Sequence, residues 1–383
     1  MTIVARLTRW VMRQWQVTGW FCRVMTPLAC LTGMVVARKQ AAFASGRRQA
    51  HHPGVPVIVV GNILVGGTGK TPVVIAVTQH LQALGMHPGI LSRGYGSRRY
   101  PDPQVGAHDL DPDRFGDEPA LINRQTGAPV AVHARRARAA TALLDAFPDI
   151  DVIVCDDGLQ HLALARDIEI IVQDQRGIGN GHLLPAGPLR EPATRLQQVA
   201  AVITNHRSLP LTLAAGPAES PFSHSTRKAA LPAQGSPGSP SSPLRIDMHI
   251  VAGQTRELNG SGRRTLAEWA ELSADMRISA AAGIGQPESF FSLLEQAGIR
   301  LQHRIGLADH FDYRASPFAD LNTDIILVTA KDGVKCHHLS DARLWEVPIE
   351  AIFDPPEFPG VLLDALAMAN SRRSSVRHRG KLL

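Results

Sequence analysis

The stretch that decides the fold is VIVVGNILVGGTGKTP, at residues 57–72. An apolar β-branched run comes first, a glycine-rich turn follows, and Gly69-Lys70-Thr71 opens an amphipathic stretch. Glycines let the backbone turn tightly, so that successive N–H groups converge on a polyphosphate. The lysine then suits the β- and γ-phosphates and the threonine hydroxyl suits Mg²⁺. We therefore predict a strand, a phosphate-binding loop and a helix, which together form a nucleotide site.

The match to the phosphate-loop pattern G-x-x-x-x-G-K-[ST] is incomplete, because Leu64 occupies the position of the first glycine. A chance glycine-rich turn is the alternative, and the strand and helix patterns on either side argue against it. Pro72 suits a first helical turn, where its missing N–H costs nothing. The residues expected to cradle the nucleotide are Leu64, Val65, Gly66, Gly67, Thr68, Gly69, Lys70 and Thr71.

Length and charge limit the possible classes of protein. A chain of 383 residues exceeds what one core usually fills, so two domains are expected. The net charge of +6 favours an acidic partner, such as anionic lipid, a phosphorylated substrate or nucleic acid, although a solvated basic surface fits equally well. The four cysteines form no C-x-x-C motif, which argues against a metal knuckle or a disulfide framework and fits a reducing cytosol.

The N-terminal segment is apolar and rich in tryptophan. Trp10, Trp15 and Trp20 occur together with arginines at positions 6, 9, 13 and 23, a composition typical of a helix that lies in a membrane interface. The longest uncharged stretch, residues 24–37, is shorter than the roughly 20 residues needed to span a bilayer. We predict a membrane-associated helical segment at residues 1–40, the alternative being a helix packed on the protein's own core.

Apolar runs alternate with helical patterns over residues 41–207, as in βαβ units, so we predict a P-loop NTPase-like domain with a parallel sheet. Residues 208–243 are dominated by proline, serine, glycine and alanine and are predicted to be a flexible insertion that activity does not need. Strand and helix patterns resume over residues 244–383, where we expect a smaller C-terminal α/β domain. The predicted strands are 57–60, 88–92, 129–132, 152–155, 168–173, 199–204, 245–251 and 323–330, and the predicted helices are 72–84, 119–126, 134–147, 267–273 and 289–297.

Paired carboxylates follow one of the predicted strands. Asp156 and Asp157 come directly after the apolar run 152–155, and an acidic residue at such a strand end holds Mg²⁺ in phosphate-loop enzymes. A capped turn is the alternative, but Lys70 and Thr71 upstream favour the metal site. His161 lies four residues beyond Asp157 and is expected either to face the same site or to be structural.

Several polar residues sit on loops that follow apolar runs. Arg93 and Tyr95, in LSRGYG, are suited to grip a phosphate and a sugar or acyl group. Asp117 precedes a predicted helix and is either an N-cap or a site carboxylate. His310, in ADHF, becomes a stronger base where a carboxylate from the other domain meets it.

Two further features carry charge. Arg190 and Glu191 form either a surface ion pair or part of the site. We interpret the basic cluster 133–138 as a solvated face rather than a nucleic-acid surface.

Seven motifs occur in one order: VGNILVGGTGKTP, LSRGYG, GDEP, DDGLQH, GNGHLLPAGPLREP, ADHF and TAKDGVK. Together they resemble the tetraacyldisaccharide 4′-kinase family, the lipid A 4′-kinases of Gram-negative bacteria. The resemblance extends from residue 60 to residue 336. Leu64, Leu159 and the stretch 208–243 depart from the family pattern, and only Leu64 bears on how the loop seats phosphates.

The resemblance implies a kinase at the cytoplasmic face of the inner membrane, peripheral or monotopic. It would transfer the γ-phosphate of ATP to the 4′-hydroxyl of an acylated glucosamine disaccharide 1-phosphate to form lipid IVA. The implied cofactors are ATP and Mg²⁺; no nucleic acid and no obligate protein partner is expected. The implied roles are Asp117, His310 and Lys70 in catalysis, Thr71, Asp156 and Asp157 at the metal, and Arg93, Tyr95, His161, Arg190 and Glu191 at the substrate.

Two other classes of function compete with this interpretation. A membrane-recruited nucleotide switch would need a water-positioning Gln or Arg and a partner surface, and neither is identifiable in the sequence. A nucleic-acid-binding protein would need a basic stripe interleaved with stacking aromatics, but aromatics make up only 5% of the chain.

Overall fold

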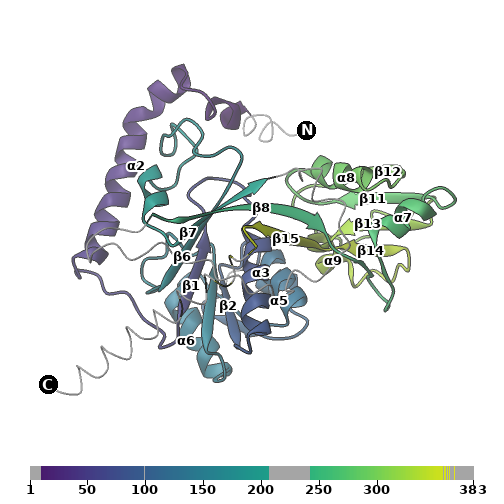
Figure 1. Cartoon of the computed structure of the whole chain (residues 1–383), viewed down its shortest axis with the longest axis horizontal. Coiled ribbons are helices and arrows are strands. Elements are labelled where there is room, and N and C mark those ends of the chain that lie inside the picture. Colours follow the sequence, from purple (N-terminus) through teal and green to yellow (C-terminus); the bar gives the residue numbers. More distant parts are fainter. Residues whose placement is uncertain are drawn as a thin grey trace.

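The computed structural model describes residues 10–98, 100–206 and 242–356, together with residues 358, 360, 362 and 366. Within these residues the chain forms a nine-stranded sheet and a six-stranded sheet, each flanked by helices (Figure 1). The predicted mixed α/β architecture, with a larger and a smaller part, is therefore confirmed.

The larger sheet has the order β15-β8-β7-β6-β1-β5-β2-β4-β3. All neighbours pair in parallel except β3 with β4 and β15 with β8. Because β1 lies between β5 and β6, the carboxyl ends of these three strands meet at one edge, where ligands bind in open parallel sheets. The strands are β1 (Val57–Gly61), β2 (Pro88–Ser92), β3 (Gln104–Gly106), β4 (Val130–Val132), β5 (Val152–Asp156), β6 (Ile168–Asp174), β7 (Ala201–His206), β8 (Leu244–Ala252) and β15 (Ile349–Asp354).

Helices cover both faces of the larger sheet, and the alternation of side chains along β1 shows how. Ile58 and Val60 pack in one core cluster with residues of α3 and α5, whereas Val57 and Val59 pack in another with residues of α6. The sequence of a strand that is buried on both faces is a continuous apolar run, as it is in β1. The helices are α3 (Lys70–Ala83), α4 (Pro112–Phe115), α5 (Asp117–Thr126) and α6 (Arg136–Ala146), and a 3-10 helix spans Ala193–Gln197.

The smaller sheet has the order β10-β9-β14-β13-β11-β12, and β14, β13, β11 and β12 pair in parallel. It packs against α7 and α8 on one face. On its other side, α9 packs against α5 of the larger part, so that α5 and α9 contribute to the contact between the two parts. The elements are β9 (Thr255–Glu257), β10 (Arg263–Arg264), α7 (Leu266–Leu272), β11 (Ile278–Ala282), α8 (Pro287–Gln296), β12 (Leu301–Gly306), β13 (Ile325–Thr329), α9 (Ala330–Cys336) and β14 (Leu344–Val347).

The boundary between the two parts differs from the prediction. The sequence suggests that the second domain starts at residue 244, but β8 pairs with β7 and β15 pairs with β8, so both belong to the larger sheet. The smaller sheet occupies only residues 255–347. The change in composition at residue 244 marks the end of a low-complexity stretch and carries no information on which sheet the next strand joins. The predicted flexible insertion lies outside the described residues, apart from its last two.

Helix α2 (Trp20–Ala44) runs along the outside of the larger part (Figure 1). Among the described residues it is the one helix that is long and apolar enough to cross a membrane, judged by length and composition alone. The uncharged stretch 24–37 is short, as the sequence indicates, but the helix continues beyond it at both ends for 25 residues in all. Only Cys22 and Ala29 of this helix are buried.

Candidate active site

Two buried asparagines hold the loop between β1 and α3 in place. Asn62 Nδ2 donates to Gly66 O over 3.3 Å and to Thr68 Oγ1 over 3.2 Å. At the end of β7, Asn205 Nδ2 donates to Thr68 O over 3.1 Å. Gly69 has a φ of 90°, and a Cβ at this position would collide with Asn205 Nδ2. Glycine is therefore required where the loop enters α3, and the loop is already shaped before a ligand binds.

Leu64 has a structural role that explains its presence in the phosphate loop. Its side chain is 1% exposed and packs in the core below the sheet edge, and its backbone bridges Leu189. The next amide, Val65 N, donates to Pro188 O over 2.9 Å. In the described part of the chain the N–H groups of residues 66–69 donate no hydrogen bond within the protein. Four successive free amides before a helix start are a typical anion-binding arrangement.

Lys70 and Asp157 lie together at the end of the loop. Lys70 Nζ is 3.7 Å from Asp157 Oδ1, and Arg190 Nη1 is 3.4 Å from Asp157 Oδ2. Burial raises the pKa of Asp157, but the positive charges of Lys70 and Arg190 outweigh burial, and the net effect is a lowered pKa. Asp157 is thus ionised at neutral pH, and three predicted site residues from three segments meet at one point.

Asp156 ends β5 and has an unsatisfied oxygen. Ser92 Oγ donates to Asp156 Oδ2 over 3.1 Å, whereas the buried Oδ1 has no hydrogen-bond partner among the described residues. Burial and the nearby carboxylate of Glu118 raise the pKa of Asp156. A buried carboxylate with one oxygen that lacks a donor, repelled by a second carboxylate, fits a site for a divalent cation. Thr71, the second residue of α3, follows Lys70 on the same helix start.

Asp117 and His310 come from different parts of the molecule and meet across the interface. His310 Nδ1 lies 2.8 Å from Asp117 Oδ2, and the Tyr95 ring centroid lies 5.7 Å from that of His310. Asp117 is the first residue of α5 and follows Gly116, whose φ is 95°. A Cβ on Gly116 would lie 2.7 Å from Tyr95 O, so glycine is needed for the loop of Tyr95 to approach α5. The N-cap of α5 is Gly116, so the N-cap interpretation of Asp117 is wrong, and its carboxylate contacts His310 instead.

The remaining predicted substrate residues differ in exposure. Arg93 and Tyr95 are exposed, and Tyr95 is 68% accessible to solvent. His161 is partly buried; burial and the positive charges of Arg136 and Arg93 lower its pKa to about 4. The imidazole of His161 is therefore neutral at physiological pH and is suited to hydrogen bonding rather than to charge pairing.

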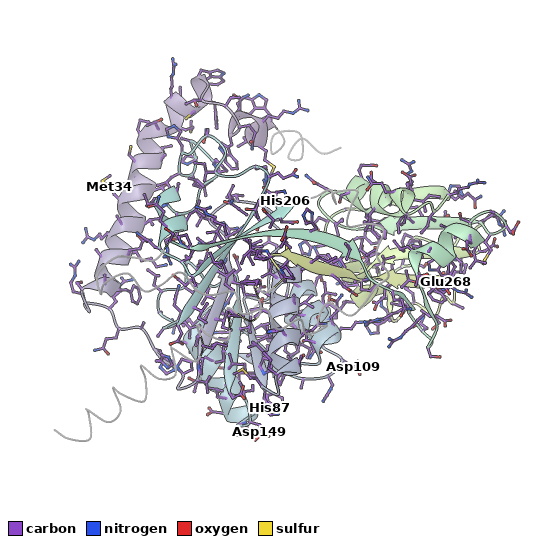
Figure 2. All side chains as sticks on the ribbon, viewed as in Figure 1. Met34, His87, Asp109, Asp149, His206 and Glu268 are labelled. Atoms are coloured by element: carbon purple, nitrogen blue, oxygen red, sulfur yellow. The ribbon has the colours of Figure 1, made fainter. Side chains whose placement is uncertain are left out.

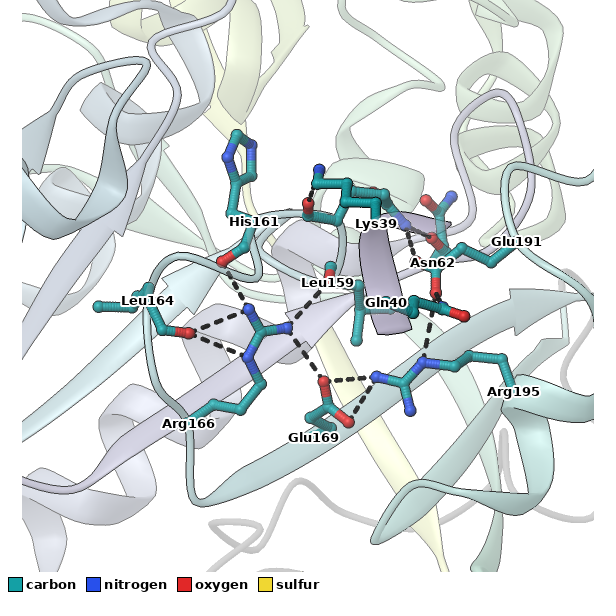
Figure 3. Close-up of polar contacts among 11 residues, drawn as sticks. Lys39, Gln40, Asn62, Leu159, His161, Leu164, Arg166, Glu169, Glu191 and Arg195 are labelled. Carbon is teal, nitrogen blue, oxygen red and sulfur yellow. Dashed lines mark hydrogen bonds and ion pairs between the residues drawn. The ribbon is translucent and has the colours of Figure 1, made fainter. Parts of the chain in front are cut away.

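The carboxylate of Glu191 is hydrogen-bonded to other side chains of the protein. It accepts from Gln160 Nε2 over 2.6 Å, from Gln40 Nε2 over 3.1 Å and from Arg195 Nε over 3.2 Å (Figure 3). Arg195 also binds Glu169, so the network ties the end of α2 to the larger sheet. With a side chain that is 4% exposed, Glu191 stabilises the loop that carries Arg190.

Two cations near the site were missed in the sequence. Arg136 belongs to the basic cluster that we interpreted as a solvated face, but it is 2% exposed, so that interpretation is wrong for this residue. It donates to His133 O over 2.7 Å and to Asp156 O over 3.4 Å. Lys335, on α9, lies 2.9 Å from Asp117 Oδ2 and is also buried. A run of basic residues at a helix start gives no sign that one of them points inward.

A preformed phosphate loop followed by a lysine, carboxylates at the adjacent strand end and a histidine–aspartate pair between two parts of the molecule define a P-loop enzyme of the phosphoryl-transfer class. The chain belongs to the tetraacyldisaccharide-1-P 4′-kinase family, whose model matches residues 21–367. The resemblance noted in the sequence is therefore confirmed.

Relatives agree with this membership over nearly the whole chain. A tetraacyldisaccharide 4′-kinase of Bordetella petrii is 52% identical over 90% of this chain and 91% of its own length. The Herminiimonas arsenicoxydans relative of the same name is 40% identical over 89% of this chain and 91% of its own length. The fold is similar to that of LpxK from Aquifex aeolicus, crystallised in complex with ATP, with a TM-score of 0.70 and 21% identity over 90% of this chain and 99% of that one.

Proposed function

We infer that this chain is an ATP-dependent kinase that phosphorylates the 4′-hydroxyl of tetraacyldisaccharide 1-phosphate, the step of lipid A biosynthesis that forms lipid IVA. Family membership over residues 21–367 supports the substrate, and the phosphate loop supports ATP as the donor. The single observation that carries the chemistry is the 2.8 Å contact between Asp117 and His310. The residue after Asp117, Glu118, is close enough to influence Asp156, so this pair adjoins the carboxylates at the phosphate loop.

The nucleotide and its metal have a defined set of candidate ligands. The free amides of residues 66–69 and the Lys70 ammonium would bind the polyphosphate. Thr71, Asp156 and Asp157 would hold Mg²⁺, with the unsatisfied Asp156 Oδ1 as the strongest indication. When bound, Mg²⁺ neutralises phosphate charge as it develops during transfer. Arg190 pairs with Asp157 and would add positive charge near the same phosphates.

The acceptor hydroxyl needs a base. A sugar hydroxyl is a poor nucleophile at neutral pH, and a positioned carboxylate can accept its proton as the bond to phosphorus forms. Asp117 would fill this role while His310 holds its second oxygen. Arg93, Tyr95 and the neutral His161 would contact the disaccharide or its phosphate, whereas Glu191 would act by holding the Arg190 loop.

The lipid substrate implies a membrane surface, and α2 offers a face for one. Cys22, Ala29 and Gly33 face the protein, with Gly33 against Leu183. The large apolar side chains of the outer face are exposed: Trp20, Val24, Leu28, Leu31, Met34 and Val35. Met34 lies on the outer side of α2, away from the sheet (Figure 2). We propose that this face enters the cytoplasmic leaflet of the inner membrane, so that the site meets its substrate at the lipid surface.

The assay that tests this function uses purified protein, γ-labelled ATP, Mg²⁺ and tetraacyldisaccharide 1-phosphate in detergent micelles. The expected product carries label on the lipid, and its position is assigned by mass spectrometry. A substrate analogue without a 4′-hydroxyl is the matched control and should remain unlabelled. Release of labelled phosphate into water, with no labelled lipid, would assign the chain to the nucleotide-hydrolysing switch class instead.

A further inference from the structure

Lys335 is a buried cation at the interface between the two parts of the molecule. It belongs to α9, whose N-cap Thr329 accepts a hydrogen bond from Asp332 N. The Lys335 side chain is 9% exposed, and its Nζ lies 5.6 Å from the centroid of the Tyr313 ring. Burial of an ammonium group is costly unless a counter-ion is near. Among the described residues, the carboxylate that meets it is Asp117 of α5, at 2.9 Å.

The two cationic partners of Asp117 share a single oxygen. His310 Nδ1 and Lys335 Nζ both approach Oδ2, at 2.8 Å and 2.9 Å. Within the described part of the chain, Oδ1 of Asp117 accepts no hydrogen bond, and both cations make their shortest contact with Oδ2. Two contacts on one oxygen fix the rotation of the carboxylate about its Cβ–Cγ bond, and they leave the other oxygen open to a substrate.

We propose that Lys335 is a positioning residue: with His310 it clamps Asp117 Oδ2 and thereby directs Asp117 Oδ1 at the acceptor hydroxyl. The inference rests on the proposed function, because it assigns Asp117 as the group that receives the hydroxyl proton. Lys335 and His310 both come from the smaller part of the molecule, whereas Asp117 belongs to the larger part. The carboxylate is therefore oriented only when the two parts are in contact, and proton transfer depends on that contact.

A second ion pair across the same interface provides a matched control. Arg124, near the other end of α5, lies 3.3 Å from the buried Glu346 of β14. This pair also joins the two parts but does not touch Asp117. If Lys335 served only to hold the parts together, its removal would resemble the removal of Arg124.

The first experiment compares Lys335→Met, Lys335→Arg and Arg124→Met in the lipid-labelling assay. Lys335→Met keeps most of the side-chain volume and removes the charge. We expect it to lower kcat by about 10- to 100-fold, the range that a misplaced reactive group produces, with KM for ATP within about twofold of wild type. Lys335→Arg should recover part of kcat, and Arg124→Met should leave kcat within about threefold. A kcat of Lys335→Met close to wild type, or equal to that of Arg124→Met, would overturn the inference.

The second experiment does not depend on transfer. Thermal unfolding midpoints are measured for Lys335→Met, Asp117→Asn and the double variant. The clamp predicts that the two single changes are strongly non-additive, since each removes the same ion pair. Additive midpoints would overturn the clamp even in an active kinase. If the changes in midpoint were non-additive but the wild-type protein labelled no lipid, the proposed function would be contradicted, whereas the contact of Lys335 with Asp117 would be supported.

Discussion

Lys70 lies at the first position of α3, with its ammonium group 3.7 Å from Asp157. Electrostatic stabilisation at the transferring group usually dominates phosphoryl transfer, so we expect Lys70→Ala to lower kcat by about 10²–10³-fold. The fold should survive, because Lys70 belongs to neither hydrophobic cluster of the larger part. Labelled-lipid formation gives the rate and circular dichroism gives the fold. A folded Lys70→Ala protein with wild-type turnover would remove Lys70 from the site.

The pair Asp117 and His310 permits a test of joint action. Each single alanine change should lower kcat by about 10²–10⁴-fold, the range for loss of a general base or its support. The double change should cost little more than the worse single change, because the two residues act as one unit. Nucleotide affinity, measured by calorimetry, should change far less than turnover. Losses that multiply independently would mean that the two residues do not work as a pair.

The lowered pKa of His161 should make the free energy of unfolding depend on pH. Burial and the charges of Arg136 and Arg93 lower its pKa to about 4 in the folded protein, below the ordinary 6.5. Between these values the unfolded state binds more protons, so the contribution of His161 to stability is complete above pH 6.5 and is lost as the pH falls toward 4.

Urea unfolding of wild type and His161→Asn at about pH 7.5 and about pH 5 measures this contribution. We expect acidification to destabilise the wild type more than the variant, because asparagine does not titrate. The difference between the two proteins cancels the titration of the other groups they share. An equal loss in both proteins would contradict a depressed pKa for His161.

At the scale of elements, the exposed apolar face of α2 should matter for activity at a membrane surface. Leu28, Leu31 and Val35 are each more than half exposed, so changing all three to serine should leave the fold and the activity in detergent nearly unchanged. Activity on substrate embedded in vesicles should fall by about tenfold or more, since each buried apolar side chain contributes roughly 1.5–3 kcal/mol to insertion. Leu84→Ser, at an exposed leucine outside α2, is the control. Equal losses in detergent and vesicles would assign the face to packing instead.

Much of the element order was predictable from the sequence, because the signals are local. The β-branched run before the glycine-rich turn forms β1, and the run 323–330 contains β13. The position of Asp156 at the end of a strand was predictable in the same way, because it directly follows an apolar run. The membership of β8 in the larger sheet could not be predicted, because strand pairing depends on partners distant in sequence.

The site residues that escaped prediction share one physical reason. Arg136 and Lys335 lie on helices, where charged residues usually face water, and only packing against another element turns them inward. The partner of Lys335 lies in another part of the chain, so no spacing could reveal it. Catalytic roles for Asp117 and His310 were expected because their motifs resemble those of a family.

At the scale of the whole molecule, the connection between β7 and β8 limits how the chain can be shortened. The two strands are parallel neighbours, with Ala201 opposite Leu244 and His206 opposite His249. The chain leaves β7 at its carboxyl end and must return to the start of β8, roughly 17 Å back along the strands at about 3.3 Å per residue. The expectation from composition, that residues 208–243 can simply be removed, therefore conflicts with the topology.

A parallel pair needs a crossover of about a dozen residues or more, so two deletions should behave differently. Joining residue 207 directly to residue 244 should disrupt the pairing of β8 with β7. Because β8 also pairs with β15 and leads to the smaller part, this error would carry His310 and Lys335 away from Asp117 and abolish transfer. Replacing residues 210–241 with about a dozen glycine and serine residues should keep kcat within about twofold and preserve the unfolding midpoint. Full activity in the direct join would contradict the parallel pairing. A loss in the glycine–serine variant as well as in the direct join would instead show that the replaced residues contribute to function beyond their length.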